Sequence, residues 1–137
     1  ELNEGQDDYV FELIVADSGC DGTQAATSAQ ALIDSGVAGI VGAACSGATL
    51  GAIAVAAPAG VPMVSYASTS PAISSAADDG YLFRVVPSDA QQSVALVDVV
   101  KAGSSNPAVL YMTNDYGAGL GENFKEALGR SVCGGRI

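Results

Sequence analysis

The stretch VAGIVGAACSGAT, residues 37–49, decides the fold prediction for this chain. Its first half, residues 37–42, is an apolar run with the length of a strand that is buried on both faces of a sheet. Small residues follow in a turn that holds Cys45, and an alanine-rich, helix-like run begins at Ser46. A strand that leads through a short turn into a helix is the unit from which parallel α/β sheets are built.

A second stretch, FELIVADSGCDGT at residues 11–23, has the same order. An apolar, strand-like run leads into a turn with Cys20, and a helix-like run begins beyond it. Turns that follow parallel strands lie at the same end of the sheet, so this order brings the sulfur atoms of Cys20 and Cys45 near each other. A bridge there would imply an oxidising compartment and would hold a ligand-binding turn in place, because open α/β sheets bind ligands at this end.

The rest of the chain continues to alternate strand-like and helix-like runs. A loop with one helical turn after Pro71 is expected over residues 66–80. The short links between elements predict an α/β fold with a doubly wound parallel sheet and right-handed crossovers. The expected strands are residues 9–16, 37–42, 61–65, 81–85 and 108–113, and the expected helices are residues 23–34, 46–57, 88–102 and 119–128.

The composition limits the classes of function. The chain has 137 residues, a net charge of −10 and five basic residues that form no cluster, so no nucleic-acid binding is expected. It has no histidine, which excludes histidine-based triads and histidine metal ligands within this chain, and no metal site is predicted. No apolar run reaches the roughly 18 residues that a membrane helix needs. Residues 1–8 are acidic and polar, unlike a signal peptide, so we expect that a signal has been removed or that the chain is a fragment.

Three turns at the carboxyl ends of predicted strands carry the possible chemistry. Residues 45–49 join small residues to the positive end of a helix and would favour a carboxylate or a phosphate, although an ordinary helix start explains the same residues. Residues 65–71 offer hydroxyl and backbone groups, or form a polar loop with local turn bonds. In residues 114–119, Tyr116 could cover a ligand with its ring, or pack on a neighbour while Asn114 and Asp115 cap a helix.

The order and spacing of these stretches resemble the type I periplasmic binding proteins, and most nearly the leucine/isoleucine/valine-binding branch that serves ABC importers. The resemblance covers residues 11–128. It rests on Cys20-Asp21, on residues 42–49, on residues 62–71 and on the turn Asn114-Asp115-Tyr116-Gly117.

The resemblance implies a set of ligand-binding residues. Ser46 would offer its hydroxyl and backbone groups to a ligand carboxylate. Ala67 and Thr69 would contact the ammonium and carboxylate groups of the ligand. Tyr116 would come from a second lobe and lie over the ligand.

The resemblance also implies a disulfide between Cys20 and Cys45. Cys133 is then a third, odd cysteine. For an exported protein we expect its partner in a continuation of the polypeptide, with an intermolecular bridge as the second choice. A catalytic role is not expected, because no histidine is present to activate the thiol.

The domain organisation and the function follow from the same resemblance. Residues 1–86 would be lobe one without its first strand and helix, and residues 87–137 would begin lobe two. The implied protein captures an amino acid or a similar small zwitterion outside the cytoplasm and hands it to an ABC permease. It would be periplasmic or extracellular, either secreted or lipid-anchored, with no cofactor and no catalysed reaction.

Three other interpretations stay open. The same fold could serve as the ligand-sensing ectodomain of a receptor. An α/β-hydrolase-like enzyme would use residues 44–47 as its nucleophile turn, but the histidine and the Gly-x-Ser-x-Gly pattern are absent. A receiver-like signalling domain would use Asp17 or Asp115 as phosphoacceptor, but the acidic pair Asp7-Asp8 precedes a strand instead of following one.

A lobe without its first strand would have an exposed sheet edge, which invites pairing with another strand. The apolar strands within residues 37–41 and 61–64 also need helices on both faces. We therefore expect this chain to be held by remaining parts of its own polypeptide or by a second copy, with domain swapping as one route.

Overall fold

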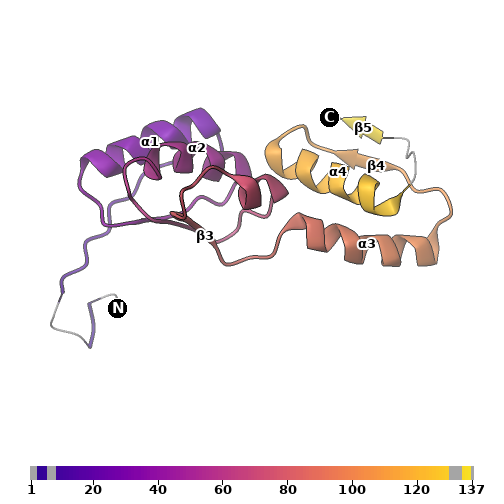
Figure 1. Cartoon of the computed structure of the whole chain (residues 1–137), viewed down its shortest axis with the longest axis horizontal. Coiled ribbons are helices and arrows are strands. Elements are labelled where there is room, and N and C mark those ends of the chain that lie inside the picture. The colour runs from indigo at the N-terminus through magenta and orange to yellow at the C-terminus, as the bar shows by residue number, and fades with distance from the viewer. Residues whose placement is uncertain (1–2, 6–8, 130–133, 137) are drawn as a thin grey trace.

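The computed structural model of the chain describes residues 3–5, 9–129 and 134–136. Figure 1 shows two α/β units beside each other, joined by the segment between β3 and α3. The first unit contains α1 (Gly22–Asp34), β1 (Ile40–Val41), α2 (Ser46–Ala56), β2 (Met63–Ser65), the 3-10 helix η1 (Pro71–Ser75) and β3 (Leu82–Arg84). The second contains α3 (Asp89–Gly103), β4 (Val109–Tyr111), α4 (Asp115–Leu128) and β5 (Gly134–Arg136).

The described strands form two parallel sheets. In the first sheet β2 lies between β1 and β3, with Met63 opposite both Ile40 and Leu82. In the second sheet β4 pairs with β5. Parallel strands that alternate with helices confirm the predicted α/β class. β5 is not among the predicted strands, because its Gly-Gly-Arg sequence has low strand propensity.

The first unit is built on two helices whose backbones touch. A Cβ atom at Gly51 of α2 would overlap the carbonyl oxygen of Gly22 in α1, so this crossing tolerates only glycine. Both helices lie on the same side of the first sheet (Figure 1). The core between them consists mostly of alanine: Ala25, Ala29, Ala43, Ala48, Ala52, Ile53, Ala56, Ala57 and Met63.

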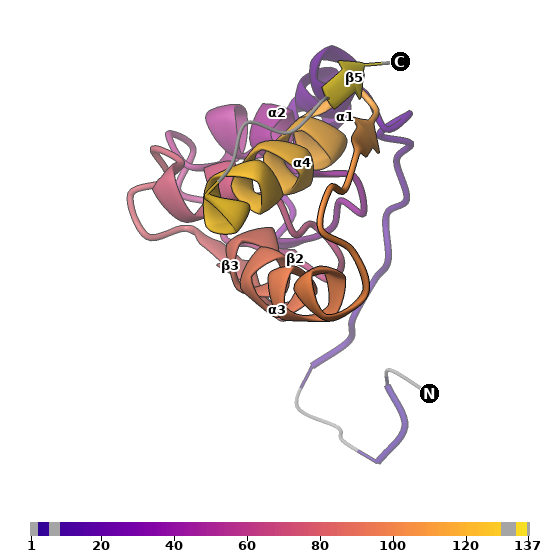
Figure 2. The same cartoon turned by 90° about the vertical axis from the view of Figure 1, so that its right-hand side faces the viewer.

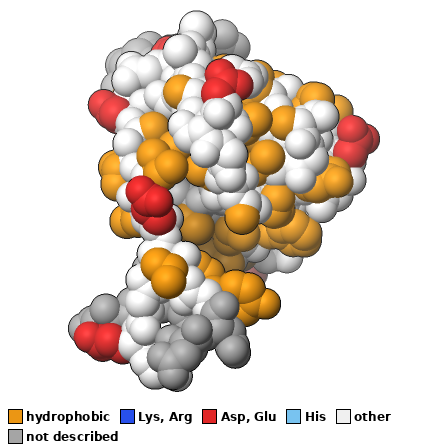
Figure 3. All heavy atoms as spheres, turned by 90° about the vertical axis from the view of Figure 1, so that its left-hand side faces the viewer, with side chains coloured by type: hydrophobic (Ala, Val, Ile, Leu, Met, Phe, Trp, Pro, Cys, Tyr) orange, Lys and Arg blue, Asp and Glu red, His pale blue; other side chains and the backbone are white. Residues whose placement is uncertain are grey.

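The opposite side of the first sheet is apolar and open. Val41, Val64 and Phe83 form one row across the three strands, and Val41 and Phe83 are 80% and 55% exposed. Figure 3 shows hydrophobic side chains spread over this end of the molecule, with acidic side chains but no visible basic ones among them. An apolar row of this kind needs a covering layer when its sheet is parallel.

Residues 9–16 do not form the predicted strand. The segment is extended but belongs to neither described sheet, and Val10 and Val15 are 92% and 82% exposed. A cavity of about 780 Å³ is lined by residues 11–16 on one side and by β1 with its turn on the other. Paired strands lie about 4.8 Å apart, whereas residues 11–16 and β1 line this cavity together with residues of α1. Figure 2 shows the segment running down one side of the molecule.

The helix starts follow the capping residues. Ser88 caps α3 as predicted, accepting a hydrogen bond from the amide of Ala90 at 3.3 Å. α4 begins at Asp115, four residues before the predicted start, because the Asn114 side chain caps it by accepting from the amide of Gly117 at 2.8 Å. This cap matches the alternative in which Asn114 and Asp115 begin a helix, and it outweighs the low helix propensity of the glycines in the first turns.

Candidate functional site

The turn after β1 leads directly into the start of α2. Cys45 is the N-cap residue of α2 but makes no side-chain capping hydrogen bond, because its sulfur is bonded to Cys20. Ser46, the first residue of the helix, is 2% exposed. The amide groups of the first helical turn therefore have no side-chain cap from the N-cap position, and the helix dipole makes this end electropositive.

The disulfide between Cys20 and Cys45 confirms that prediction. Their Cα atoms lie 5.2 Å apart, and the two residues are 25 positions apart in sequence. The bridge joins the turn before α1 to the turn before α2, at the carboxyl end of the sheet. Cys133 lies outside the described residues, so its pairing stays a prediction.

The turn after β2 is hydrogen-bonded to the start of α2. The amide of Ser70 donates to Ser46 Oγ at 3.2 Å, which brings the Thr69–Ser70 backbone beside the first residue of the helix. Thr69 is half-buried, and Ala67 is exposed with its backbone on the same turn. The structure thus brings Ser46 and Thr69 together, with Ala67 on the outer part of the same turn.

Asp89 is a member of this site that the sequence pattern did not single out. Its carboxylate is completely buried, and Oδ2 accepts a hydrogen bond from Thr69 Oγ1 at 2.9 Å. The Asp89 amide also donates to the Thr69 carbonyl at 2.9 Å. Oδ1 is buried with no hydrogen-bond partner in the described part of the chain. An unsatisfied buried carboxylate oxygen is costly, and a donor such as an ammonium group would satisfy it.

In the sequence, Asp89 directly follows the helix-capping Ser88. An acidic residue at a helix start is common, so its local pattern indicates only favourable interaction with the helix dipole. The burial that distinguishes Asp89 arises from the approach of the Thr69 turn, 20 residues away.

Arg84 forms hydrogen bonds to the loop after β2 and to η1. Its Nη1 donates to the Ser70 carbonyl at 3.0 Å, and its Nη2 donates to Ser74 Oγ at 2.6 Å. The guanidinium group therefore ties the end of β3 to the loop and η1. Because its N–H groups are bonded to these oxygens, the guanidinium group stabilises the turn.

The second unit meets the first near the start of α4. A Cβ atom at Gly47 would come 2.5 Å from Asp115 Oδ2, and one at Gly119 would come 3.0 Å from Ser70 Oγ. These approaches place the first turns of α4 against the start of α2 and the turn that follows β2. The exposed carboxylate of Asp115 adds negative charge at this junction.

Tyr116 has a different neighbourhood from Ser46 and Thr69. Its side chain is 46% exposed and lines an apolar cavity of about 370 Å³ between β4, α3 and α4, together with Met112, Leu120 and Phe124. Its role over a ligand stays a prediction.

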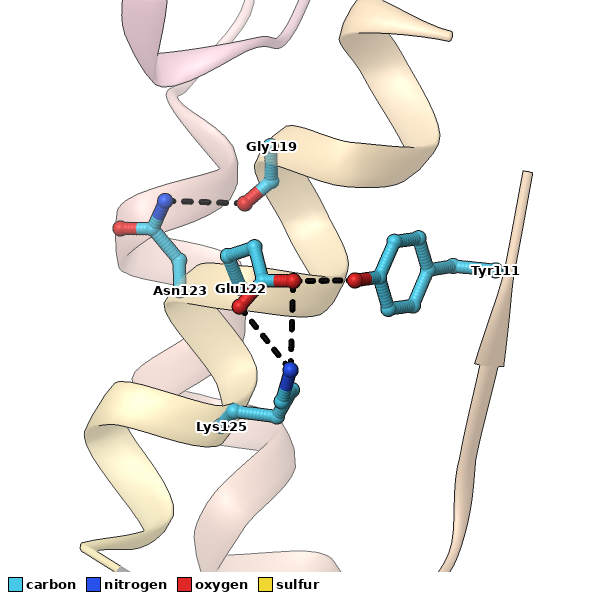
Figure 4. A network of polar contacts seen from close by, with 5 residues as sticks. All are labelled: Tyr111, Gly119, Glu122, Asn123 and Lys125. Carbon is cyan, nitrogen blue, oxygen red and sulfur yellow. Dashed lines mark hydrogen bonds and ion pairs between the residues drawn. The ribbon is translucent and has the colours of Figure 1, made fainter. Parts of the chain in front are cut away.

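A polar cluster on α4 lies apart from this site. Figure 4 shows Glu122 between the hydroxyl of Tyr111 and the ammonium group of Lys125, with Asn123 bonded to the Gly119 carbonyl. Lys125 Nζ lies 3.0 Å from Glu122 Oε2 and 5.8 Å from the centre of the Tyr111 ring. These exposed contacts hold α4 on β4, and surface pairs of this kind contribute about 1 kcal/mol or less.

The described ranges carry neither a metal-binding cluster nor a membrane-spanning helix. No group of three or more acidic, cysteine or histidine residues there could hold a metal ion. In that same part of the chain, every helix is too short or too polar to cross a membrane.

A family model described as the receptor family ligand binding region matches residues 2–133. The chain belongs to this family. One relative in the family, an amino acid binding protein of Pseudomonas aeruginosa, is 32% identical over 125 residues, covering 88% of this chain and 33% of that protein. Metabotropic glutamate receptor 8 of Homo sapiens is 32% identical over 99 residues, covering 72% of this chain and 11% of the receptor.

Two solved structures are similar over most of the chain. A leucine binding protein of Thermotoga maritima has a TM-score of 0.76 and 28% identity, covering 92% of this chain and 37% of that one. An ABC transporter substrate-binding protein of Desulfitobacterium hafniense in complex with Leu has a TM-score of 0.73 and 27% identity, covering 91% and 38%. The fold is therefore that of type I periplasmic binding proteins, and the chain spans less than two fifths of each of these relatives.

Proposed function

We propose that this chain is part of a solute-binding protein that captures an amino acid or a similar small zwitterion. The observation that carries the proposal is that the loop after β2 contacts two groups of complementary charge. The start of α2 at Ser46 is electropositive and has no side-chain cap from its N-cap residue. The buried Asp89 carboxylate accepts a hydrogen bond from Thr69 through Oδ2, and its Oδ1 is unsatisfied. Ser70 connects them through its bond to Ser46. A zwitterion offers a carboxylate for the first group and an ammonium for the second.

Each predicted residue has a role in this proposal. Ser46 and the amides behind it receive the ligand carboxylate, and the Ala67 backbone and Thr69 hydroxyl contact its polar groups. Asp89 receives the ammonium, directly or through Thr69. Tyr116 approaches from the second lobe when the lobes close, so residues 1–86 act as lobe one and residues 87–137 as the beginning of lobe two. Closure excludes water and strengthens every polar contact in the site.

The remaining parts of the polypeptide complete the fold in this proposal. The relatives are much longer than this chain, and the first sheet has an open apolar row and a cavity beside β1. Further strands and helices from the same polypeptide, or from a second copy, would cover them. The protein then works outside the cytoplasm, where its disulfide persists, and passes its ligand to an ABC permease without catalysing a reaction.

A receptor ectodomain is the second candidate function. The similarity to metabotropic glutamate receptor 8 over 72% of this chain favours it. Both candidates would bind the same class of ligand between the two lobes. They differ in what the ligand-bound form acts on, which is an ABC permease for the first and the rest of a receptor for the second. The hydrolase interpretation is weakened by the disulfide, because Cys45 is not a free nucleophile.

Isothermal titration of the complete polypeptide with amino acids tests the proposal. A branched-chain amino acid is compared with the carboxylic acid that lacks its amino group, and with the amine that lacks its carboxylate. We expect measurable affinity for the zwitterion and a large loss for both analogues. Equal binding of the analogue without an ammonium would contradict the role of Asp89, and absence of binding across all amino acids would contradict the proposal.

Replacing Thr69 by valine keeps the shape of the side chain and removes its hydroxyl. We expect amino-acid affinity to fall about 5- to 150-fold, corresponding to roughly 1–3 kcal/mol, because a buried polar partner is left unsatisfied. The matched control is Thr27→Val on the exposed surface of α1, where the hydroxyl donates to the Thr23 carbonyl of the same helix. An unchanged affinity in Thr69→Val would remove Thr69 from the site.

A further inference from the structure

We infer that three buried hydroxyl residues, Thr49, Ser65 and Ser68, are positioning residues that set the geometry of the ligand-binding turns. The inference rests on the proposed function of this site. None of the three hydroxyls contacts the ligand in this proposal. All three side chains are completely buried, at 0% exposure.

The three hydroxyls converge on one carbonyl oxygen. Ala43 O lies within hydrogen-bond distance of all three hydroxyl oxygens: 2.8 Å from Ser65 Oγ, 3.1 Å from Ser68 Oγ and 3.2 Å from Thr49 Oγ1. Ser68 Oγ also lies 3.1 Å from Ala44 O and 2.7 Å from Thr49 Oγ1. Thr49 Oγ1 accepts from the Ala43 amide at 3.1 Å, so the cluster holds both polar groups of that residue.

The cluster joins three separate elements. Ala43 and Ala44 form the turn after β1, Thr49 lies in the first turns of α2, and Ser65 and Ser68 flank the turn after β2. The Ser68 amide donates to Ser65 Oγ at 3.2 Å, which closes the β2 turn on itself. The cluster therefore fixes these elements relative to one another from inside the protein.

The position of Ser68 explains why this matters for binding. Ser68 lies between Ala67 and Thr69, the two residues of the turn assigned to the ligand. Its side chain points inward, so its neighbours in the turn are held in a fixed orientation. Ala43 and Ala44 hold the other turn directly before Cys45 and Ser46. A site whose donors are fixed in advance loses less entropy when the ligand binds.

Packing alone does not require these residue types. The surrounding core is built mostly of alanine, and alanine or valine would fill similar volumes without buried polar atoms. Hydroxyls in such a core are favourable only when they are hydrogen-bonded, as all three are here. Their convergence on one residue's backbone indicates a requirement for orientation beyond burial.

A matched pair at Thr49 tests the inference in the complete polypeptide. Thr49→Val keeps the shape and removes the hydroxyl, whereas Thr49→Ser keeps the hydroxyl and removes a methyl group. We expect Thr49→Val to lower amino-acid affinity about tenfold and Thr49→Ser to retain affinity within about twofold. The reverse order, or equal affinity in the two variants, would overturn the inference, because packing alone would then explain Thr49.

Ser68→Ala provides a second test with its own control. Ser93 in α3 is also completely buried, and its hydroxyl donates to the Leu120 carbonyl at 3.4 Å, within the second unit. We expect both alanine variants to lose stability, and only Ser68→Ala to lose affinity, again about tenfold. Equal affinities in Ser68→Ala and Ser93→Ala would overturn the positioning role.

Hydrogen exchange separates this inference from the proposed function. The amides of Ser68 and Ser70 donate to Ser65 and Ser46, so they report the order of the β2 turn without a ligand. We expect Ser68→Ala to speed exchange at these amides at least tenfold and Ser93→Ala to leave them unchanged. Unchanged exchange in Ser68→Ala would overturn the inference. Lack of amino-acid binding by the unaltered protein, with the exchange effect present, would contradict only the proposed function.

Discussion

The two units of this chain bury their main helices in different ways. In the first unit, α2 is apolar around most of its circumference and packs through small residues such as Ala48, Ala52 and Ala56. In the second unit, α4 buries a single stripe, Gly117, Gly121, Phe124 and Leu128, and carries charged residues on its outer face. The stripe has the 3–4-residue spacing of an amphipathic helix, whereas α2 is a helix enclosed by protein.

This difference predicts a difference in stability between the units. The first unit has an alanine-rich core, a disulfide and a buried hydroxyl cluster that joins the turns after β1 and β2. The described core of the second unit consists of Val97, Phe124 and Leu128 with partly buried neighbours, and an open apolar cavity adjoins it. Local opening is easiest where few apolar contacts are buried, so we expect the second unit to open first.

Removing the largest core side chain of the second unit tests this expected difference most strongly. Phe124 is 8% exposed, and Phe124→Ala should lower the free energy of unfolding by about 3–5 kcal/mol, because the lost contacts are not replaced. Hydrogen exchange followed by mass spectrometry should show protection lost in α3 and α4 and retained in α1 and α2. Leu110→Ala, at a position that is 69% exposed, serves as the control with a change near 0.5 kcal/mol or less. Equal loss in both units would mean that they unfold together.

Removing the disulfide tests the expected difference in stability by destabilising the first unit. The double variant Cys20→Ser/Cys45→Ser releases a loop closed across 25 positions, which should cost about 3 kcal/mol. Exchange should quicken in α1 and in the turn before α2, while α3 and α4 keep their protection. The unaltered protein under non-reducing conditions is the reference. Faster exchange confined to the second unit would contradict the expected difference.

The sequence predicted the first unit well because its signals are local. Apolar strands, small-residue turns and the two cysteines repeat in one order, and this order predicts a parallel sheet whose turns meet at one end. The Cys20–Cys45 bridge and the approach of Ser46 to the Thr69 turn follow from that geometry. The resemblance to binding proteins then supplied roles for individual residues.

The misses depend on contacts that are distant in sequence. Residues 9–16 have strand propensity, but a strand forms only when a neighbour pairs with it, and a cavity lies beside β1 instead. Asp89 looks like an ordinary helix-cap neighbour until the Thr69 turn buries it. The hydroxyl cluster at Ala43 is equally hidden, because serine and threonine in a turn usually indicate local bonds or solvent exposure.

Two glycine substitutions sharpen the comparison with the smallest expected effects. A Cβ atom at Gly51 would overlap the Gly22 carbonyl where α1 and α2 cross, so Gly51→Ala should lower the free energy of unfolding by about 1–3 kcal/mol. At Gly103, the end of α3, a Cβ atom would meet no other atom within 4 Å. Gly103→Ala should therefore raise the free energy of unfolding by about 0.5–1 kcal/mol, through reduced backbone entropy in the unfolded chain. Denaturant titration followed by circular dichroism measures both. Opposite signs are expected because Gly51 lies at a tight helix crossing and Gly103 at an unobstructed helix end, and stabilisation by Gly51→Ala would show that the helix crossing can relax at little cost.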